Sequence, residues 1–348
     1  MKKKFLILVL MLISIMTFAQ EIAPSTTFAG SADSYYKHDF SGQIDQPVSS
    51  SFTNSSSSFQ LGMASIEATH KFKKGAVFVD LGFGNRASEF SYNDQSDTFM
   101  IKQLTFAYDV SDKLKVTMGS FGTHLGYELV DAIDNKNYSM SYAFTNGPFF
   151  NTGIKAQYLL GKFSVMAGVT NTTDFKSAID AGGSTNKTFI AQLGYVEETS
   201  IAYFNMTTGS NNPLSNKNTN QFDIVATKKL SNKCAVTINA TYASITDDID
   251  RNLNGAWYSV VGYASYEIRE NLNMSYRIEY FDDKAALSAS AINGKILGNT
   301  LSLNYKSGNL TIIPEFRFDK SSQEVFLKND LEHSKSNTYI LLATTYLF

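Results

Sequence analysis

The stretch that decides the fold is Ser336-Asn-Thr-Tyr-Ile-Leu-Leu-Ala-Thr-Thr-Tyr-Leu-Phe348. Every second residue counted back from Phe348 gives Tyr346, Thr344, Leu342 and Ile340. Alternation with a period of two places these side chains on one face of an extended chain. The stretch therefore predicts one long β-strand whose last level carries aromatic rings.

This strand resembles the carboxy-terminal assembly signal of bacterial outer-membrane β-barrels, which commonly finish on an aromatic residue. Tyr346 and Phe348 are the residues that carry the resemblance. It implies an outer-membrane location and recognition by barrel-assembly machinery.

The first nineteen residues have the layout of a secretory signal peptide. Lys2, Lys3 and Lys4 precede the apolar run Phe5–Phe18, and Ala19 is a small residue at a suitable cleavage position. The alternative, an uncleaved membrane anchor, needs about 20 apolar residues, more than this run supplies. We therefore expect a cleaved signal peptide over residues 1–19 and one outer-membrane barrel over residues 20–348.

Composition excludes several other classes of protein. The chain is 43% hydrophobic and 18% charged, with a formal net charge of −2, which argues against a nucleic-acid partner. It contains only 5 prolines, as expected where most backbone N–H groups pair between strands. Cys234 is the single cysteine, so no internal disulfide forms, and no Cys/His cluster predicts a metal or cofactor.

Turn-forming segments divide the chain into strands of about ten residues. Seven short turns alternate with eight longer polar loops, which requires about sixteen strands with both termini at the short-turn end. The sequence thus predicts an all-β, antiparallel up-and-down transmembrane barrel with short periplasmic turns and longer extracellular loops. A soluble β-sandwich, the alternative for alternating strands, normally has shorter strands and more Gly/Pro turns.

Parity along the strands separates a lipid-facing apolar side from a lumenal polar side. In Leu272–Asp282, for example, Tyr276 and Ile278 share one face while Arg277 and Glu279 share the other. The same parity, with apolar faces toward lipid, predicts these pore-lining residues: Asp80, Arg86, Lys155, Arg277, Glu279, Glu315, Arg317 and Asp319. The alternative for each of them is an ion-pair network that only holds the lumen together.

The longest connection, Gly122–Phe150, is the candidate constriction loop. We expect part of it to fold into the lumen, and a simple exposed loop is the alternative. Its candidate constriction residues are His124, Glu128, Asp131, Asp134 and Lys136.

Catalytic motifs are not visible in the sequence. The four histidines (His38, His70, His124 and His333) are scattered, and no nucleophile elbow, metal-ligand spacing or Walker-type loop occurs. We expect no enzyme, although a Ser/His pair brought together on a barrel wall would escape such a reading.

Several short motifs, in this order, are similar to a known family. They are Asp33-Ser-Tyr-Tyr36, Gly119-Ser-Phe-Gly122, Gly126-Tyr-Glu128, Asn137-Tyr-Ser-Met-Ser141, Pro148-Phe-Phe-Asn-Thr-Gly153, Gly168-Val-Thr-Asn171, Arg277-Ile-Glu279 and Pro314-Glu-Phe-Arg-Phe-Asp319. The mature chain resembles the β-barrel porin-2 (OmpL-like) family along nearly its whole length. Asn171-Thr-Thr-Asp174 departs from the pattern, where a Gly-Trp-like pair would follow the asparagine.

The resemblance implies a barrel pore in the outer membrane of a Gram-negative bacterium. We expect a porin, a passive diffusion channel for small hydrophilic solutes and ions through a polar lumen. A non-channel barrel that acts as a surface adhesin or binding scaffold is the alternative. The sequence leaves the choice between monomer and oligomer open.

Overall fold

The structure is a computed structural model that describes residues 23–43, 46–94, 98, 100–178, 180, 182–210, 217–247, 250, 254–329 and 331–348. The expected signal peptide, residues 1–19, lies outside the described residues. Short non-barrel elements are the helices α2 (Asn85–Phe90) and α3 (Tyr142–Thr145), the 3-10 turn η2 (Ala132–Asp134), and the hairpin β16 (Phe326–Leu327) with β17 (His333–Ser334). None of the described helices has the length and apolar character needed to cross a membrane.

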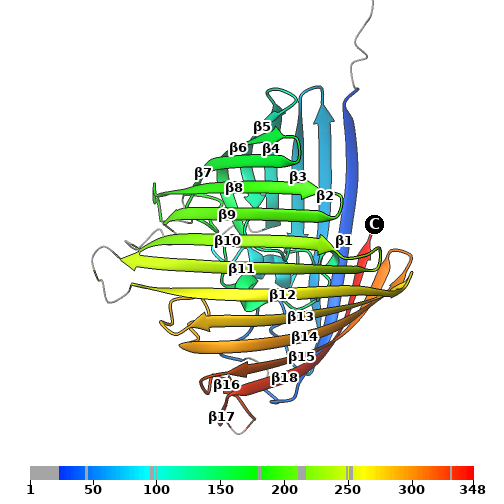
Figure 1. Ribbon diagram of the computed structural model, residues 1–348, viewed down its shortest axis with the longest axis vertical. Coiled ribbons are helices and arrows are strands. Elements are labelled where there is room, and N and C mark those ends of the chain that lie inside the picture. The colour runs from blue at the N-terminus through cyan, green and yellow to red at the C-terminus, as the bar shows by residue number, and fades with distance from the viewer. Residues whose placement is uncertain are drawn as a thin grey trace, which may run out of the picture.

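Sixteen of the described strands form one closed antiparallel barrel (Figure 1). Each strand pairs with its sequence neighbours, and β18 closes the barrel against β1. The prediction of about sixteen strands is therefore confirmed. The barrel strands are β1 (Ser25–Asp39), β2 (Ser58–Phe72), β3 (Gly75–Phe83), β4 (Ile101–Asp109), β5 (Leu114–Gly122), β6 (Phe150–Leu160), β7 (Phe163–Asn171), β8 (Lys187–Glu197), β9 (Ser200–Ser210), β10 (Lys217–Lys229), β11 (Cys234–Asp247), β12 (Gly255–Arg269), β13 (Leu272–Asp283), β14 (Gly294–Ser307), β15 (Leu310–Ser321) and β18 (Ser336–Leu347).

The closing seam joins the first and last barrel strands. Ser31 lies opposite Leu347, and the pairing continues to Asp39 opposite Tyr339. Beyond it, Gly30 and Phe348 exchange two backbone hydrogen bonds of 2.9 Å each. A Cβ atom on Gly30 would lie 2.4 Å from the Phe348 ring and 2.8 Å from the Ser65 carbonyl oxygen, so a larger residue would displace the ring or the backbone. The seam leaves no free edge, which a membrane requires of a sheet.

Short and long connections lie at opposite ends of the barrel. Seven turns of two or four residues join β2 to β3, β4 to β5 and so on to β14–β15, and eight longer segments join the strands at the other end. Figure 1 shows the carboxy-terminus at the end where the β8–β9, β10–β11 and β12–β13 turns lie. The predicted alternation of turns and loops is confirmed.

Alternation along each strand sorts side chains between the outside and the inside. On β13, Tyr276 and Ile278 are 39% and 43% exposed, whereas Arg277 and Glu279 are each 1% exposed. The apolar outer surface suits a lipid environment, and the polar side chains point inward. The largest buried side chains, among them Tyr138, Met140 and Tyr142, also lie inside and come from the β5–β6 connection.

Candidate functional site

Residues 123–149, the connection between β5 and β6, cross the interior of the barrel and are called the lumen loop below. On one side, the backbone N–H of Gly126 donates to Asp223 Oδ1 on β10 at 3.0 Å. On the other side, Tyr138 Oη donates to Asp33 Oδ2 on β1 at 2.8 Å. The loop therefore spans the lumen from the β10 wall to the β1 wall.

Two glutamates of the wall hold the backbone of the lumen loop in the same way. Glu315 on β15 accepts the backbone N–H groups of Tyr138 and Ser139 at 2.7 and 3.1 Å. Glu279 on β13 accepts those of Tyr142 and Ala143 at 2.9 and 2.8 Å. Hydrogen bonds from consecutive amides to a carboxylate are charge-assisted and roughly twice as strong as neutral ones.

Two arginines of the wall donate hydrogen bonds to backbone carbonyl groups of the lumen loop, in the segment between the amides bound by Glu315 and Glu279. Arg277 donates to the Ser139 carbonyl at 2.5 Å and to Glu128 Oε1 at 2.6 Å. Arg317 donates to the Met140 carbonyl at 2.6 Å. The guanidinium groups thus satisfy loop carbonyls in a dry interior, where an unpaired carbonyl is costly.

The wall residues that bind the backbone of the lumen loop are called the clamp below. Five of the predicted pore-lining residues belong to or adjoin the clamp: Arg277, Glu279, Glu315, Arg317 and Asp319. Each is at most 3% exposed, and Asp319 accepts from Arg317 Nε at 2.9 Å and from Tyr142 Oη at 2.9 Å. They face inward as the strand parity predicts, but they contact the lumen loop. Their role in solute passage stays a prediction.

A second buried network lies between β3, β4 and the lumen loop. Lys102 Nζ lies 3.0 Å from Asp80 Oδ2 and 2.6 Å from Asp131 Oδ1, and Ser65 Oγ donates to the same oxygen of Asp131 at 2.9 Å. Sequence reasoning named Asp80 and Asp131 but missed Lys102. Strand parity could not have found it, because Lys102 is out of phase with the buried Thr105 and lies inside only through the register shift of the β3–β4 pairing next to Asp80.

Arg86 does not lie on a barrel strand, although its prediction from strand parity requires one. Strand β3 ends at Phe83, and Gly84 has a φ of 116°, which turns the chain into α2. Arg86 is fully buried on this helix and donates to the Val130 carbonyl at 3.1 Å. The strand assignment of Arg86 is therefore wrong, although the side chain still points at the lumen loop.

The remaining predicted residues occupy separate places. Lys155 lies on β6 with Nζ 4.0 Å from the centroid of the Phe121 ring. His124 forms a 2.9 Å hydrogen bond between Nε2 and the Met206 carbonyl, and burial lowers its pKa below the ordinary value. Burial raises the pKa of Asp134 and lowers that of Lys136, which also faces Lys306.

Three cavities lie in a row between the lumen loop and the wall formed by β8–β13. The outer chamber, of about 590 Å³, lies near the long loops and contacts Lys217 and Trp257. The neck, of about 20 Å³, shares Gly147, Pro148 and Gln221 with it. The inner chamber, of about 140 Å³ and near the short turns, shares Tyr127 and Glu128 with the neck.

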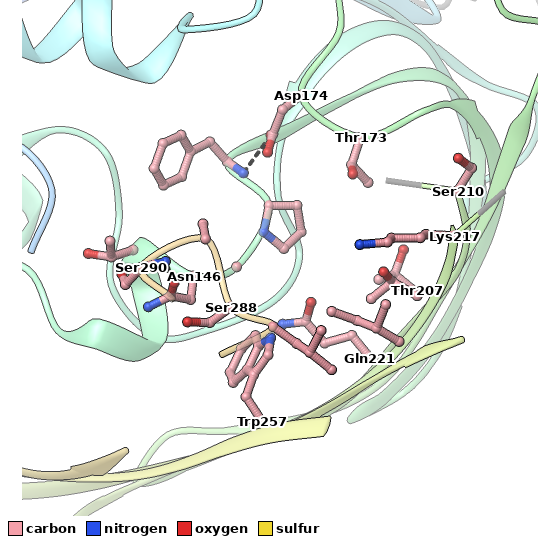
Figure 2. Close-up of a pocket in the computed structure, with 18 of the residues that line it drawn as sticks. Asn146, Thr173, Asp174, Thr207, Ser210, Lys217, Gln221, Trp257, Ser288 and Ser290 are labelled. Carbon is pink, nitrogen blue, oxygen red and sulfur yellow. Dashed lines mark hydrogen bonds between the residues drawn. The ribbon is translucent and has the colours of Figure 1, made fainter. Parts of the chain in front are cut away.

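The outer chamber is bounded by wall and loop residues on facing sides. Figure 2 shows Thr207 and Lys217 opposite Asn146 and Ser288, with Trp257 along the lower edge. Asp174 at the upper edge accepts the N–H groups of the two neighbouring residues Phe149 and Phe150 at 2.7 and 2.9 Å. Burial raises the pKa of Asp174 to about 6, against the opposing effect of these two hydrogen bonds.

Within the described ranges, no group of three or more His, Cys, Asp or Glu side chains is placed to hold a metal ion. The contacts described above are hydrogen bonds and ion pairs.

Solved structures with the same fold are bacterial outer-membrane proteins. A loop L8 deletion mutant of OmpT from Vibrio cholerae matches with a TM-score of 0.63 and 11% identity, covering 94% of this chain and 100% of that one. The anion-selective porin from Comamonas acidovorans matches with a TM-score of 0.61 and 12% identity, covering 93% and 100%. The outer-membrane channel DcaP of Acinetobacter baumannii matches with a TM-score of 0.60 and 12% identity, covering 95% and 99%.

At these identities the structures establish the fold alone. No curated protein matches the sequence. The family model described as "Putative beta-barrel porin-2, OmpL-like" matches residues 25–348, which is the whole described barrel. Together with the closed sixteen-stranded barrel, this match places the protein in the bacterial outer membrane. The chain belongs to the beta-barrel porin-2, OmpL-like family.

Proposed function

We propose that the protein is a passive diffusion channel for small hydrophilic solutes, with a path along the β10–β12 wall. The observation that carries the proposal is the row of outer chamber, neck and inner chamber, which runs from the long-loop end toward the short-turn end. Solutes would be selected by bore and by fixed charge, without covalent chemistry.

The neck sets the expected size limit. Its wall consists of Gln221 on β10 and of Asn239 and Thr241 on β11, and Gly126 and Ser141 lie on the loop side. A volume of about 20 Å³ is close to the ~10–15 Å³ that one water molecule requires. Anything larger than water would pass only when the loop side of the neck shifts, so we expect a low conductance.

Planar-bilayer recording of the purified protein tests the proposal. Stepwise conductance that is small for a sixteen-stranded barrel is the expected result. Complete absence of steps at every salt concentration would contradict it.

The second candidate function is a non-channel barrel that acts as a binding scaffold or surface adhesin. It is favoured by the burial of Arg277, Glu279, Glu315 and Arg317 against the lumen loop, each at most 3% exposed. The same recordings separate the two, because a scaffold gives no steps. An enzymatic role would instead require that one Ser or His substitution abolish a hydrolase activity.

The oligomeric state is a separate proposal. One solved structure with the same fold is a trimer form of OmpT from Vibrio cholerae. We propose that this chain also associates through its apolar outer surface. Cross-linking in native membranes that yields only monomers would contradict this.

A further inference from the structure

The outer chamber has the size and shape of a binding site. Its volume of about 590 Å³ falls within the range of ~300–1,000 Å³ that small-molecule sites occupy. It lies at the long-loop end of the barrel. There it is enclosed between the ends of β9–β12 nearest the long loops and residues 145–149 of the lumen loop. A solute arriving from outside would meet this chamber before the neck.

The carboxylates that line the chamber are already engaged by protein groups. Asp174 accepts the backbone N–H groups of Phe149 and Phe150. Glu89 accepts the backbone N–H of Phe52 and the Asn54 amide, both at 2.9 Å. Lys217 is the single cation among the described lining residues. Because both acids are held, the groups offered to a solute are mostly uncharged.

Two hydroxyl groups on the β9–β10 wall are left without partners among the described residues. The Oγ1 atoms of Thr207 and Thr219 have no hydrogen bond within the described structure, although the two residues are only 4% and 7% exposed. Thr207 lies directly opposite Gln221 in the strand register, and Thr219 lies two residues before Gln221 on the same face. Thr207, Thr219 and Gln221 therefore form one compact patch that lines the chamber. Figure 2 shows Thr207 and Gln221 side by side on this wall.

An apolar surface completes the chamber next to this patch. Trp257 on β12 packs against Phe281 with ring centroids 5.4 Å apart and borders the cavity. An amphipathic solute can hydrogen-bond to the threonines while its apolar face lies against such a ring.

We propose that the outer chamber binds an uncharged polyhydroxylated solute, a sugar, through Thr207, Thr219 and Gln221 before the solute reaches the neck. Buried hydroxyls without partners gain most from a ligand that both donates and accepts hydrogen bonds. This inference deepens the proposed function and rests on it for the route by which the solute travels.

Fluorescence of Trp257 provides a direct measurement, because it is the only tryptophan of the chain. The purified full-length protein is titrated with lactose and with lactobionate, an anion of similar size. We expect a saturable emission change with lactose and a Kd at least about tenfold weaker for lactobionate. No saturable response to lactose, or equal or tighter binding of lactobionate, would overturn the proposal with the wild-type protein alone.

A double variant, Thr207→Val with Thr219→Val, tests the assigned groups. Losing two neutral hydrogen bonds should raise the Kd for lactose by about 5- to 150-fold. Thr345→Val is the matched control, because its hydroxyl is also buried and unpaired but lies on β18, away from the chamber. An unchanged Kd in a folded double variant would overturn the assignment.

Bilayer recordings keep this inference separate from the channel proposal. Conductance without a lactose response would contradict the sugar site and support the channel. A lactose response without conductance would contradict the channel and support a chamber that binds sugar.

Discussion

Replacing Glu279 and Glu315 together by glutamine should release the lumen loop from the wall. Each carboxylate accepts two consecutive backbone N–H groups of the loop. A glutamine keeps the shape but offers one acceptor oxygen, so each substitution loses one charge-assisted bond and turns the amide NH₂ group toward a second donor.

The loss can be estimated from these bonds. A hydrogen bond to a charged group contributes about 1.5–3 kcal/mol, so two lost bonds weaken loop docking by about 3–6 kcal/mol. Since ~1.4 kcal/mol is a factor of ten, the undocked population should rise by roughly 10²- to 10⁴-fold. The buried charges of Arg277 and Arg317 also lose two compensating carboxylates, with Glu128 and Asp319 remaining.

Single-channel recording is the assay. The double variant should show a larger conductance level that the wild type lacks, and its reversal potential in a salt gradient should shift toward anion selectivity. Glu270→Gln is the matched control, because Glu270 lies exposed in the β12–β13 turn. Wild-type conductance levels and reversal potential in a folded double variant would contradict the inference that Glu279 and Glu315 hold the lumen loop against the wall.

Three further predictions concern pH, the fold and assembly. Because burial, together with Lys155, lowers the pKa of His124, the folded state favours the neutral ring. Loop docking is therefore most stable above the unfolded pKa of ~6.5 and weakens as pH falls below it. His124→Gln should reduce the dependence of open events on pH between 7.5 and 5, and the dependence that remains comes from Asp174, whose pKa of about 6 lies in the same range. Gly119→Ala should lower the free energy of unfolding by more than about 1 kcal/mol, as measured by denaturant titration, since φ is 133° and the new Cβ would lie 2.0 Å from the Leu104 carbonyl oxygen. Gly122→Ala is the control and should have little effect, because its new Cβ would lie 3.8 Å from the nearest atom. Deleting Phe348 should lower the yield of inserted barrel more than the conductance of the molecules that do insert; a normal yield would contradict its role as an assembly signal.

The barrel could be predicted because its determinants are local. Alternation such as that of Leu272–Asp282 fixes which side chains face lipid, and turn residues fix where strands end. Counting turns and loops then gives the strand number without any long-range information. The inward direction of Arg277 and Glu279 follows from the same parity.

The contacts of those inward residues could not be predicted. Glu315 binds the N–H of Tyr138 across 177 residues of sequence, and Glu279 binds that of Tyr142 across 137. Parity says that a carboxylate points inward, but not whether water or a distant loop meets it. Arg86 was misplaced for a related reason: the positive φ of Gly84 ends the strand, and hydrophobic alternation does not report a backbone dihedral.

The outer chamber could not be predicted from the sequence. Thr207, Thr219 and Trp257 are ordinary strand residues there, and their meeting depends on which neighbours the lumen loop leaves unpaired. Cavities are properties of packing between distant segments, which no local pattern encodes.

Chemical modification in the neck tests the central claim, that solutes pass along the β10–β12 wall. Gln221 lines both the outer chamber and the neck. Gln221→Cys, made in a Cys234→Ser background to leave one thiol, is recorded in a planar bilayer before and after a bulky cationic methanethiosulfonate reagent is added. A stepwise and lasting drop in conductance, absent in Cys234→Ser alone, is the predicted result. Unchanged conductance after complete modification of the thiol would contradict the path.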